Sequence, residues 1–227
     1  EKSIDVASYL QQGAVSAIFE GTIDASAQIG NGNTNGIDIT GDDITFANKV
    51  TTTGAGSVKI TNDKLLMIAA EADFKVAGDF VQTSTSKDGE VKLGGDIRTT
   101  DGNITFGNAT YGTRVVLSGP VELSTEDQRG DITFFGEVDG TAAGTETLTM
   151  TAVGDITFKG AVGTGQRLGT IDIKNATKVT ADSSIVAASL LQRAGAGLTT
   201  FSGEIDTNKS VGLPSDTKVS YGVSIDS

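Results

Sequence analysis

Short stretches in which apolar and polar residues alternate recur along most of the chain, and one of them is repeated several times. The sequence Gly-Asp-Ile-Thr-Phe at 130–134 returns at 154–158, at 102–106 with Asn in place of Asp, and at 41–46 with one extra acid. Successive side chains of a strand point to opposite faces, so Ile and Phe share one face while Asp and Thr share the other. Each copy therefore predicts a short, half-buried strand between glycine bends.

The spacing of the phenylalanines predicts how these strands are arranged. The interval from Phe46 to Phe74 equals that from Phe106 to Phe134, and the interval from Phe134 to Phe158 is slightly shorter. Recurrence at such a period is typical of solenoids. With at least two strands in each period, equivalent strands can stack in parallel, so we expect an all-β chain that forms a right-handed parallel β-helix (β-solenoid) of roughly eight coils. The second set of alternating strands is expected at 58–60, 91–93, 115–117, 148–150 and 171–173.

A longer repeat encloses the coil-sized one. Residues 7–11 share Ala, Ser, Leu and Gln with residues 188–192 at an offset of 181, and residues 19–24 share Phe, Gly, Ile and Asp with residues 201–206 at an offset of 182. An ordered series of matches with one insertion indicates duplication. We therefore predict a single β-solenoid segment over residues 1–227. It holds one super-repeat, whose length is the offset of 181 between Ala7 and Ala188, and the start of the next. The first spans about 4–184, and the second begins over 185–227.

The repeat length also bears on the alternative fold, a tandem β-sandwich. An immunoglobulin-like sandwich needs about one hundred residues per domain, and no repeat of that length is present. The solenoid is therefore the favoured prediction. Since the chain begins at Glu1 without a methionine, we expect it to be a piece of a larger tandem array.

Four stretches interrupt or end the coil pattern. The Asn/Gly-rich residues 26–40 and the polar residues 83–90 are expected to be surface loops. The apolar run at 65–70 is short, which favours a buried strand or bend over a helix. A turn is expected at Pro214.

Composition and charge narrow the possible partners. The chain has 30 Gly, 2 Pro, no Trp and 5% aromatic residues, which suits a narrow solenoid interior filled by single layers of side chains. Its net charge is −12, with 29 acids against 17 bases, so neither nucleic acid nor an anionic membrane surface is expected as a partner. No apolar run approaches the ~18 residues of a spanning helix, so no membrane span is expected.

Candidate catalytic chemistry is sparse. The chain contains no His and no Cys, which excludes Ser-His-Asp triads, thiolate nucleophiles and the usual zinc sites. Paired carboxylates could still cleave polysaccharides. However, Asp131 and Asp155 occupy the same position in the repeat, so duplication explains them, whereas a catalytic pair should be unique to one coil. We therefore predict that the chain is not an enzyme.

The repeated acids suggest calcium as the one candidate cofactor. Asp43, Asn103, Asp131 and Asp155 precede the repeated Ile-Thr-Phe strands. On coils ~4.8 Å apart they would form an acidic ladder, and a cation between rungs would relieve the repulsion between carboxylates. The nonapeptide pattern of calcium-binding β-rolls is absent.

The order of these motifs resembles the long tandem repeats of giant bacterial surface proteins, similar in style to filamentous-haemagglutinin and autotransporter-type β-solenoids. The motifs that carry the resemblance lie at 95–100, 103–106, 119–123, 130–134 and 154–163, and the likeness extends over nearly the whole chain.

The resemblance implies an exported, non-enzymatic structural segment of an extracellular or cell-envelope rod or fibre. Its partners would be further repeats of the same protein, with head-to-tail self-assembly. The alternative is an adhesin module that binds glycans or a host or neighbouring cell surface. The resemblance carries no catalytic residues over to this chain.

Overall fold

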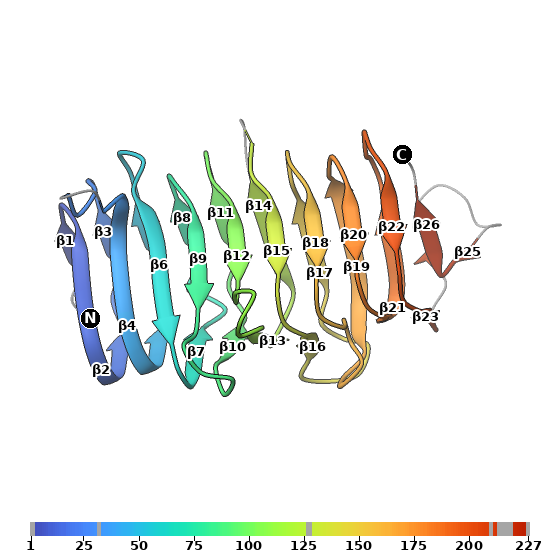
Figure 1. Cartoon of the computed structure of the whole chain (residues 1–227), viewed down its shortest axis with the longest axis horizontal. Coiled ribbons are helices and arrows are strands. Elements are labelled where there is room, and N and C mark those ends of the chain that lie inside the picture. Colours follow the sequence, from blue (N-terminus) through green and yellow to red (C-terminus); the bar gives the residue numbers. More distant parts are fainter. Residues whose placement is uncertain (1–2, 31–32, 126–128, 209–210, 213–219, 226–227) are drawn as a thin grey trace.

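The computed structural model describes residues 3–30, 33–125, 129–208, 211–212 and 220–225. Within these residues the chain is a parallel β-solenoid of about eight turns without a helix. The coils stack along the long axis from the N-terminal to the C-terminal end (Figure 1). The all-β parallel β-helix is thus confirmed, and the tandem β-sandwich is wrong, because the strands of successive coils pair in parallel. The right-handed sense of the coil stays a prediction.

Each turn passes through three stacks of strands, named here faces A, B and C in chain order. Face A comprises β1 (Ile4–Val6), β3 (Ile23–Ala25), β5 (Val50–Thr52), β8 (Phe74–Val76), β11 (Ile97–Thr99), β14 (Val121–Thr125), β17 (Leu148–Thr151), β19 (Leu168–Asn175), the end of β21 (Ile185–Gln192) and β26 (Val223–Ile225).

The other two faces share two long strands that run round the bend between them. Face B comprises the first parts of β2 (Tyr9–Phe19) and β4 (Asn35–Phe46), then β6 (Ser57–Asn62), β9 (Phe80–Thr83), β12 (Ile104–Phe106), β15 (Ile132–Phe134), β18 (Ile156–Phe158), β20 (Val179–Ala181) and β22 (Thr199–Phe201). Face C comprises the last parts of β2 and β4, then β7 (Leu65–Ile68), β10 (Glu90–Leu93), β13 (Arg114–Leu117), β16 (Val138–Gly140), Val162, the start of β21 and β23 (Ile205–Thr207).

Three of the four repeated Ile-Thr-Phe strands lie in register on face B. Residues 104–106, 132–134 and 156–158 pair residue for residue, with Ile and Phe buried inside and Thr turned outward. The fourth copy, at 44–46, lies on face C, where Ile44 pairs with Leu66. Its expected equivalence to the other three is therefore wrong. The physical reason is that all three faces line one interior, so the same alternating pattern suits any of them.

Phenylalanine rings from successive coils form one continuous column through the interior, which runs through Phe19, Phe46, Phe74, Phe80, Phe106, Phe134 and Phe158. Phe46 on face C contacts Phe74 on face A at a centroid distance of 5.1 Å, and Phe74 contacts Phe80 on face B at 5.4 Å. The column then continues along face B through Phe106 and Phe134. The regular spacing of Phe46 and Phe74 in the sequence therefore includes a change of face. Burying each ring stabilises the fold by about 1.5–3 kcal/mol.

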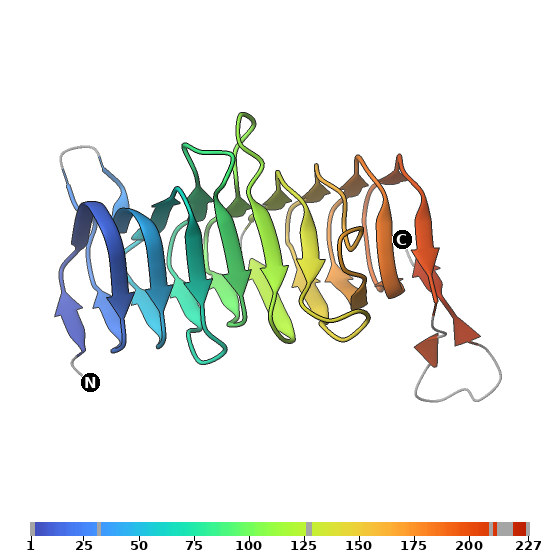
Figure 2. The same ribbon diagram turned by 90° about the horizontal axis from the view of Figure 1, so that it is seen from below.

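The connections agree in part with the sequence. Residues 84–89 join β9 to β10 as an irregular loop, whereas the two end residues of the loop expected at 83–90 belong to these strands. β7 supplies the buried strand expected within 65–70. Residues 35–40, expected in a loop, belong to β4. The chain also carries a hairpin of β24 (Val211–Gly212) and β25 (Ser220–Tyr221), which pair antiparallel and project from the C-terminal end in Figure 2. The turn expected at Pro214 lies outside the described residues.

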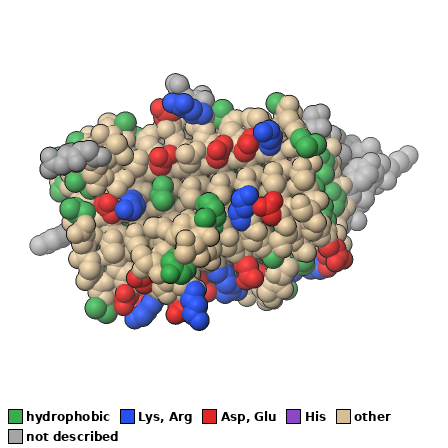
Figure 3. All heavy atoms as spheres, in the orientation of Figure 1, with side chains coloured by type: hydrophobic (Ala, Val, Ile, Leu, Met, Phe, Trp, Pro, Cys, Tyr) green, Lys and Arg blue, Asp and Glu red, His purple; other side chains and the backbone are tan. Residues whose placement is uncertain are grey.

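The outward residues are mostly polar and of mixed charge, with a few exposed apolar side chains such as Val15 and Leu198. Figure 3 shows Lys and Arg side chains interspersed with Asp and Glu over the visible face, without a block of one sign. Ion pairs join neighbouring coils, as between Lys159 and Asp182 at 2.9 Å and between Arg193 and Asp172 at 2.7 Å. Exposed pairs of this kind contribute little stability individually.

Candidate functional site

The most regular arrangement of polar groups lies at the bend between faces A and B. Threonine hydroxyls at the end of face A bond to carbonyls in the bend: Thr99 Oγ1 donates to Gly102 O at 2.6 Å, and Thr125 Oγ1 donates to Gly130 O at 2.9 Å. Both threonines are buried. These bonds fix the same bend in successive coils.

The glycines of these bends stack closely from coil to coil. A Cβ atom on Gly130 would lie 2.3 Å from Gly102 O, and one on Gly154 would lie 2.1 Å from Asp131 Oδ1. Such distances are shorter than any allowed contact, so the bend requires glycine for close approach. The glycine that opens each repeated motif is thus explained by packing between coils.

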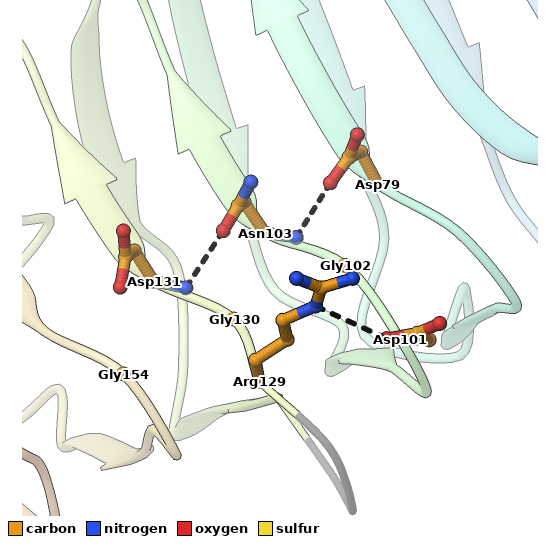
Figure 4. Close-up of a pocket in the computed structure, with 8 residues that line it drawn as sticks. All are labelled: Asp79, Asp101, Gly102, Asn103, Arg129, Gly130, Asp131 and Gly154. Atoms are coloured by element: carbon orange, nitrogen blue, oxygen red, sulfur yellow. Dashed lines mark hydrogen bonds and ion pairs between the residues drawn. The ribbon is translucent and has the colours of Figure 1, made fainter.

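The residue after each bend glycine belongs to what we call the Asx ladder, formed by Asp79, Asn103, Asp131 and Asp155. The Asn103 N–H donates to Asp79 Oδ1 at 2.7 Å, and the Asp131 N–H donates to Asn103 Oδ1 at 2.8 Å (Figure 4). The Asp155 N–H donates to Asp131 Oδ1 at 2.7 Å. Asp79, Asn103 and Asp131 therefore each accept a backbone hydrogen bond from the next coil. Hydrogen bonds to an ionised acceptor contribute more than neutral ones, so the ladder joins the coils at this bend.

A shallow hollow of about 410 Å³ lies beside the Asx ladder. Its Arg129 and Asp101 form an ion pair with a nitrogen-to-oxygen distance of 3.9 Å, and both side chains are more than half exposed, so the pair is weak. The hollow offers hydrogen-bond donors and acceptors to a polar molecule. Its lining consists of Asp79, Asp101, Gly102, Asn103, Arg129, Gly130, Asp131 and Gly154.

The structure brings together three of the four calcium candidates. Asp131 and Asp155 lie on adjacent rungs, with Asn103 on the rung before them. Asp43 lies elsewhere, on face C, where its Oδ1 accepts a hydrogen bond from Leu65 N–H at 3.3 Å. The Oδ1 atoms of Asp79, Asn103 and Asp131 already accept hydrogen bonds from backbone amides. The Lys178 ammonium lies 4.0 Å from Asp155 Oδ2.

These contacts limit what the Asx ladder can offer a cation. Asp79 and Asp131 are two rungs apart, roughly 9.6 Å along the axis, which is too far for ligands of one calcium ion. Among the residues that the structure describes, no group of three or more acids is placed to hold a metal ion. Asp131 and Asp155 are the best-placed pair, and calcium binding there stays a prediction.

Two polar features were missed from the sequence. Asp73, Asp96 and Glu122 form a second ladder at the bend into face A: Asp96 N–H donates to Asp73 Oδ1 at 3.2 Å, and Glu122 N–H donates to Asp96 Oδ1 at 2.7 Å. An acid directly before a buried strand residue was the available signal, as at Asp73-Phe74.

The second feature lies on face C, where Arg114 bridges Glu90 and the buried Asp139 with nitrogen-to-oxygen distances of 3.0 Å each. That contact joins three successive coils, so no local pattern predicts it.

Another buried acid is Glu146. Burial raises the pKa of Glu146, but hydrogen bonds from Thr141, Thr145 and the Ala142 N–H lower it, and the pKa lies below its ordinary value. Its Oε2 atom has no hydrogen-bond partner among the described residues. A Cβ atom on Gly140 would lie 2.5 Å from that oxygen, so this carboxylate is packed against the backbone of face C.

A comparison of the chain with protein-family models, curated proteins and solved structures gives no match. The described part of the chain contains no helix of the length and apolar character needed to cross a bilayer. The fold and the repeated bends are therefore the observations from which function is argued.

Proposed function

We propose that this chain is a structural segment of a tandem-repeat protein that forms a stiff rod or fibre outside a cell or in its envelope. The observation that carries the proposal is the recurrence of one coil. β1 pairs with β3, and one super-repeat later β21 pairs with β23 through the equivalent residues. A unit that begins again at the end of the rod is suited to serial extension.

The mechanical properties follow from the pairing. Backbone hydrogen bonds run parallel to the long axis on all three faces, and the phenylalanine column fills the interior between them. Bending the rod would break bonds on one face or compress them on another. The first coil leaves the outer edges of β1 and β2 unpaired within the described residues. Such edges are covered when another repeat stacks on them.

This proposal places the chain with giant bacterial surface proteins of the filamentous-haemagglutinin and autotransporter type. In such a rod the partners of this segment would be further repeats, and the segment itself would have no catalytic role. The excess of acids and the mixed surface charge support a protein that stays soluble and does not associate non-specifically.

Small-angle scattering of the purified chain over a concentration series tests the proposal. A rod near 40 Å long, from about eight coils of ~4.8 Å, is expected, and growth in length at constant cross-section would show end-to-end assembly. A compact particle of fixed size would contradict the rod.

A matched variant separates end-to-end from side-by-side association. Leu10, Val15 and Ile18 are exposed apolar residues on the outer side of β2, at 53%, 74% and 65% exposure. Ile18 lies on face C, so in I18K lateral association through Ile18 should disappear, whereas end-to-end growth should persist.

An adhesin module is the second candidate, and the hollow beside the Asx ladder favours it. Aspartate, asparagine and arginine side chains there can bond to the hydroxyl groups of a glycan. A glycan array probed with the wild-type chain and with R129A tests this function. Binding that R129A abolishes would support an adhesin, and the absence of binding to any glycan would contradict it.

A further inference from the structure

The sequence super-repeat has a structural counterpart in the strand pairing. Ile4 of β1 lies opposite Ile23 of β3, and Ile185 of β21 lies opposite Ile205 of β23. These two pairs are related by the sequence offsets of 181 and 182. In the same way β2 pairs with β4, and the corresponding part of β21 pairs with β26. The first coil is thus rebuilt near the C-terminal end.

The rebuilt coil does not occupy the same faces as the first. From β1 on face A, the chain makes seven complete turns to β19 on face A, and two further strand positions bring it to the start of β21 on face C. The super-repeat therefore spans about seven and two-thirds turns. Equivalent residues step back by one face: Gln11 to Gln192 from B to A, Phe19 to Phe201 from C to B, and Ile23 to Ile205 from A to C.

Two hairpins make the same displacement visible. After β3, Ile29 N–H donates to Asn35 O at 2.7 Å in an antiparallel connection between faces A and B. After β23, the equivalent of β3, the antiparallel pair of β24 and β25 lies between faces C and A. In Figure 2 the first connection projects on the upper side at the N-terminal end, whereas β24 and β25 project on the lower side at the C-terminal end.

We infer that successive super-repeats of the parent protein are each turned by one face, about a third of a turn, about the axis of the rod. The inference rests on the proposed function, since it concerns a tandem array. Three super-repeats are needed before the same face returns to the same side. A feature carried once per repeat, such as the hairpin, is then presented in three directions around the rod.

The inference specifies the partner of the exposed N-terminal edge. Residues 185–201 rest on the coil formed by residues 162–181, through Ile185 opposite Val162 and Leu190 opposite Ile171. Because residues 4–19 are the equivalents of 185–201, their edge fits a coil of that kind in the preceding repeat. Ile4 then lies opposite the counterpart of Val162.

Introduced cysteine pairs test the rotation in the full chain, which has no cysteine of its own. Thr170 Oγ1 and Ser189 Oγ lie 3.0 Å apart across two coils, so T170C/S189C should form a disulfide almost completely under mild oxidation. Ser189 is the equivalent of Ser8, which lies at the bend between faces A and B. A super-repeat of whole turns would instead place Ser189 beside Thr177, so T177C/S189C is the matched control and should stay reduced.

The outcomes separate the rotation from the rod. A disulfide in T177C/S189C but not in T170C/S189C would overturn the inference. The inference would also be overturned if neither variant forms a disulfide although circular dichroism shows that both have a native spectrum. If T170C/S189C does not fold, T180C/T200C, whose residues pair on face B, replaces it with the same expected disulfide. Failure of the proposed function appears separately, as a rod whose length in scattering stays the same at every concentration, and does not alter the crosslinks.

Discussion

Phe134 and Phe158 stack with their ring centroids 5.2 Å apart and their planes inclined by 4°. Each ring belongs to a different coil, so the contact joins two turns of the rod through its interior. Both side chains are almost fully buried. The phenylalanine column therefore contributes to cohesion along the axis as well as to the packing of each coil.

F134A should lower the free energy of unfolding by about 3–5 kcal/mol, because it leaves a cavity between two coils. F134L should cost less, since Leu refills part of the space. Urea unfolding followed by circular dichroism gives both values. T133A, on the outer side of the same strand, is the control and should change stability by no more than about 0.5 kcal/mol. Equal effects of F134A and T133A would contradict a packed interior.

Substitutions of Asn103 separate hydrogen bonding from charge in the Asx ladder. N103A removes the acceptor of the Asp131 N–H and should cost about 1 kcal/mol at any ionic strength. N103D keeps the acceptor but places carboxylates on all four consecutive rungs, so its loss of stability should shrink as salt screens the repulsion. Thermal unfolding midpoints of the wild type, N103A and N103D at low and at high sodium chloride measure this difference in salt dependence.

N103D also tests whether the Asx ladder binds calcium. If the ladder binds calcium, millimolar Ca²⁺ should restore the stability of N103D where Mg²⁺ at equal ionic strength does not. Equal effects of the two cations would argue for screening alone.

Glu146 should make stability depend on pH in the acidic range. Its folded-state pKa lies below the unfolded value, so its contribution is present above the unfolded pKa and is lost as pH falls through the folded one. E146Q should be less stable than the wild type at neutral pH, and the difference should narrow on acidification. Unfolding midpoints of both chains from neutral pH downward check this. A constant difference across the range would show that the charge of Glu146 has no part in it.

Gly163 should tolerate no side chain. Its φ is +70°, and a Cβ atom there would lie 1.9 Å from Val186 O in the next coil. G163A should therefore cost about 3 kcal/mol, since backbone strain adds to overpacking. Gly119 has no atom within 4 Å of such a Cβ and no positive φ, so G119A should be nearly neutral. Comparable unfolding midpoints for the two variants would contradict the close contact at Gly163.

The strands of face B show how much of the fold the sequence could predict. Residues 132–134 alternate in polarity, recur at coil spacing and follow a glycine, and these local features are enough to predict a stacked, half-buried strand. The number of faces was not predictable in this way. Phe46, Phe74 and Phe106 meet in one interior although they come from faces C, A and B. Spacing alone therefore treats positions on different faces as equivalent.

The candidate site was predictable to a similar degree. Asn103, Asp131 and Asp155 were placed together because they share one repeated motif. Asp79 was missed because Phe80-Val81-Gln82 follows it in place of Ile-Thr-Phe, and Asp43 was included because its motif recurs on another face. The role of these side chains as acceptors for backbone amides depends on the exact alignment of two coils. That alignment is a property of the stack, which no single coil encodes.

The short range of the pairing has a consequence for how the chain folds. On face B, partners in successive coils are separated by a single turn of the chain, as for Val179 and Thr199 or for Ile104 and Ile132. Each coil can therefore close as soon as one more turn of chain has been synthesised, with the finished coil as its template. Folding of this kind can spread from one finished coil to the next and requires no distant segment for completion. A rod assembled in this way can be lengthened by gene duplication without any change to the coils already in place.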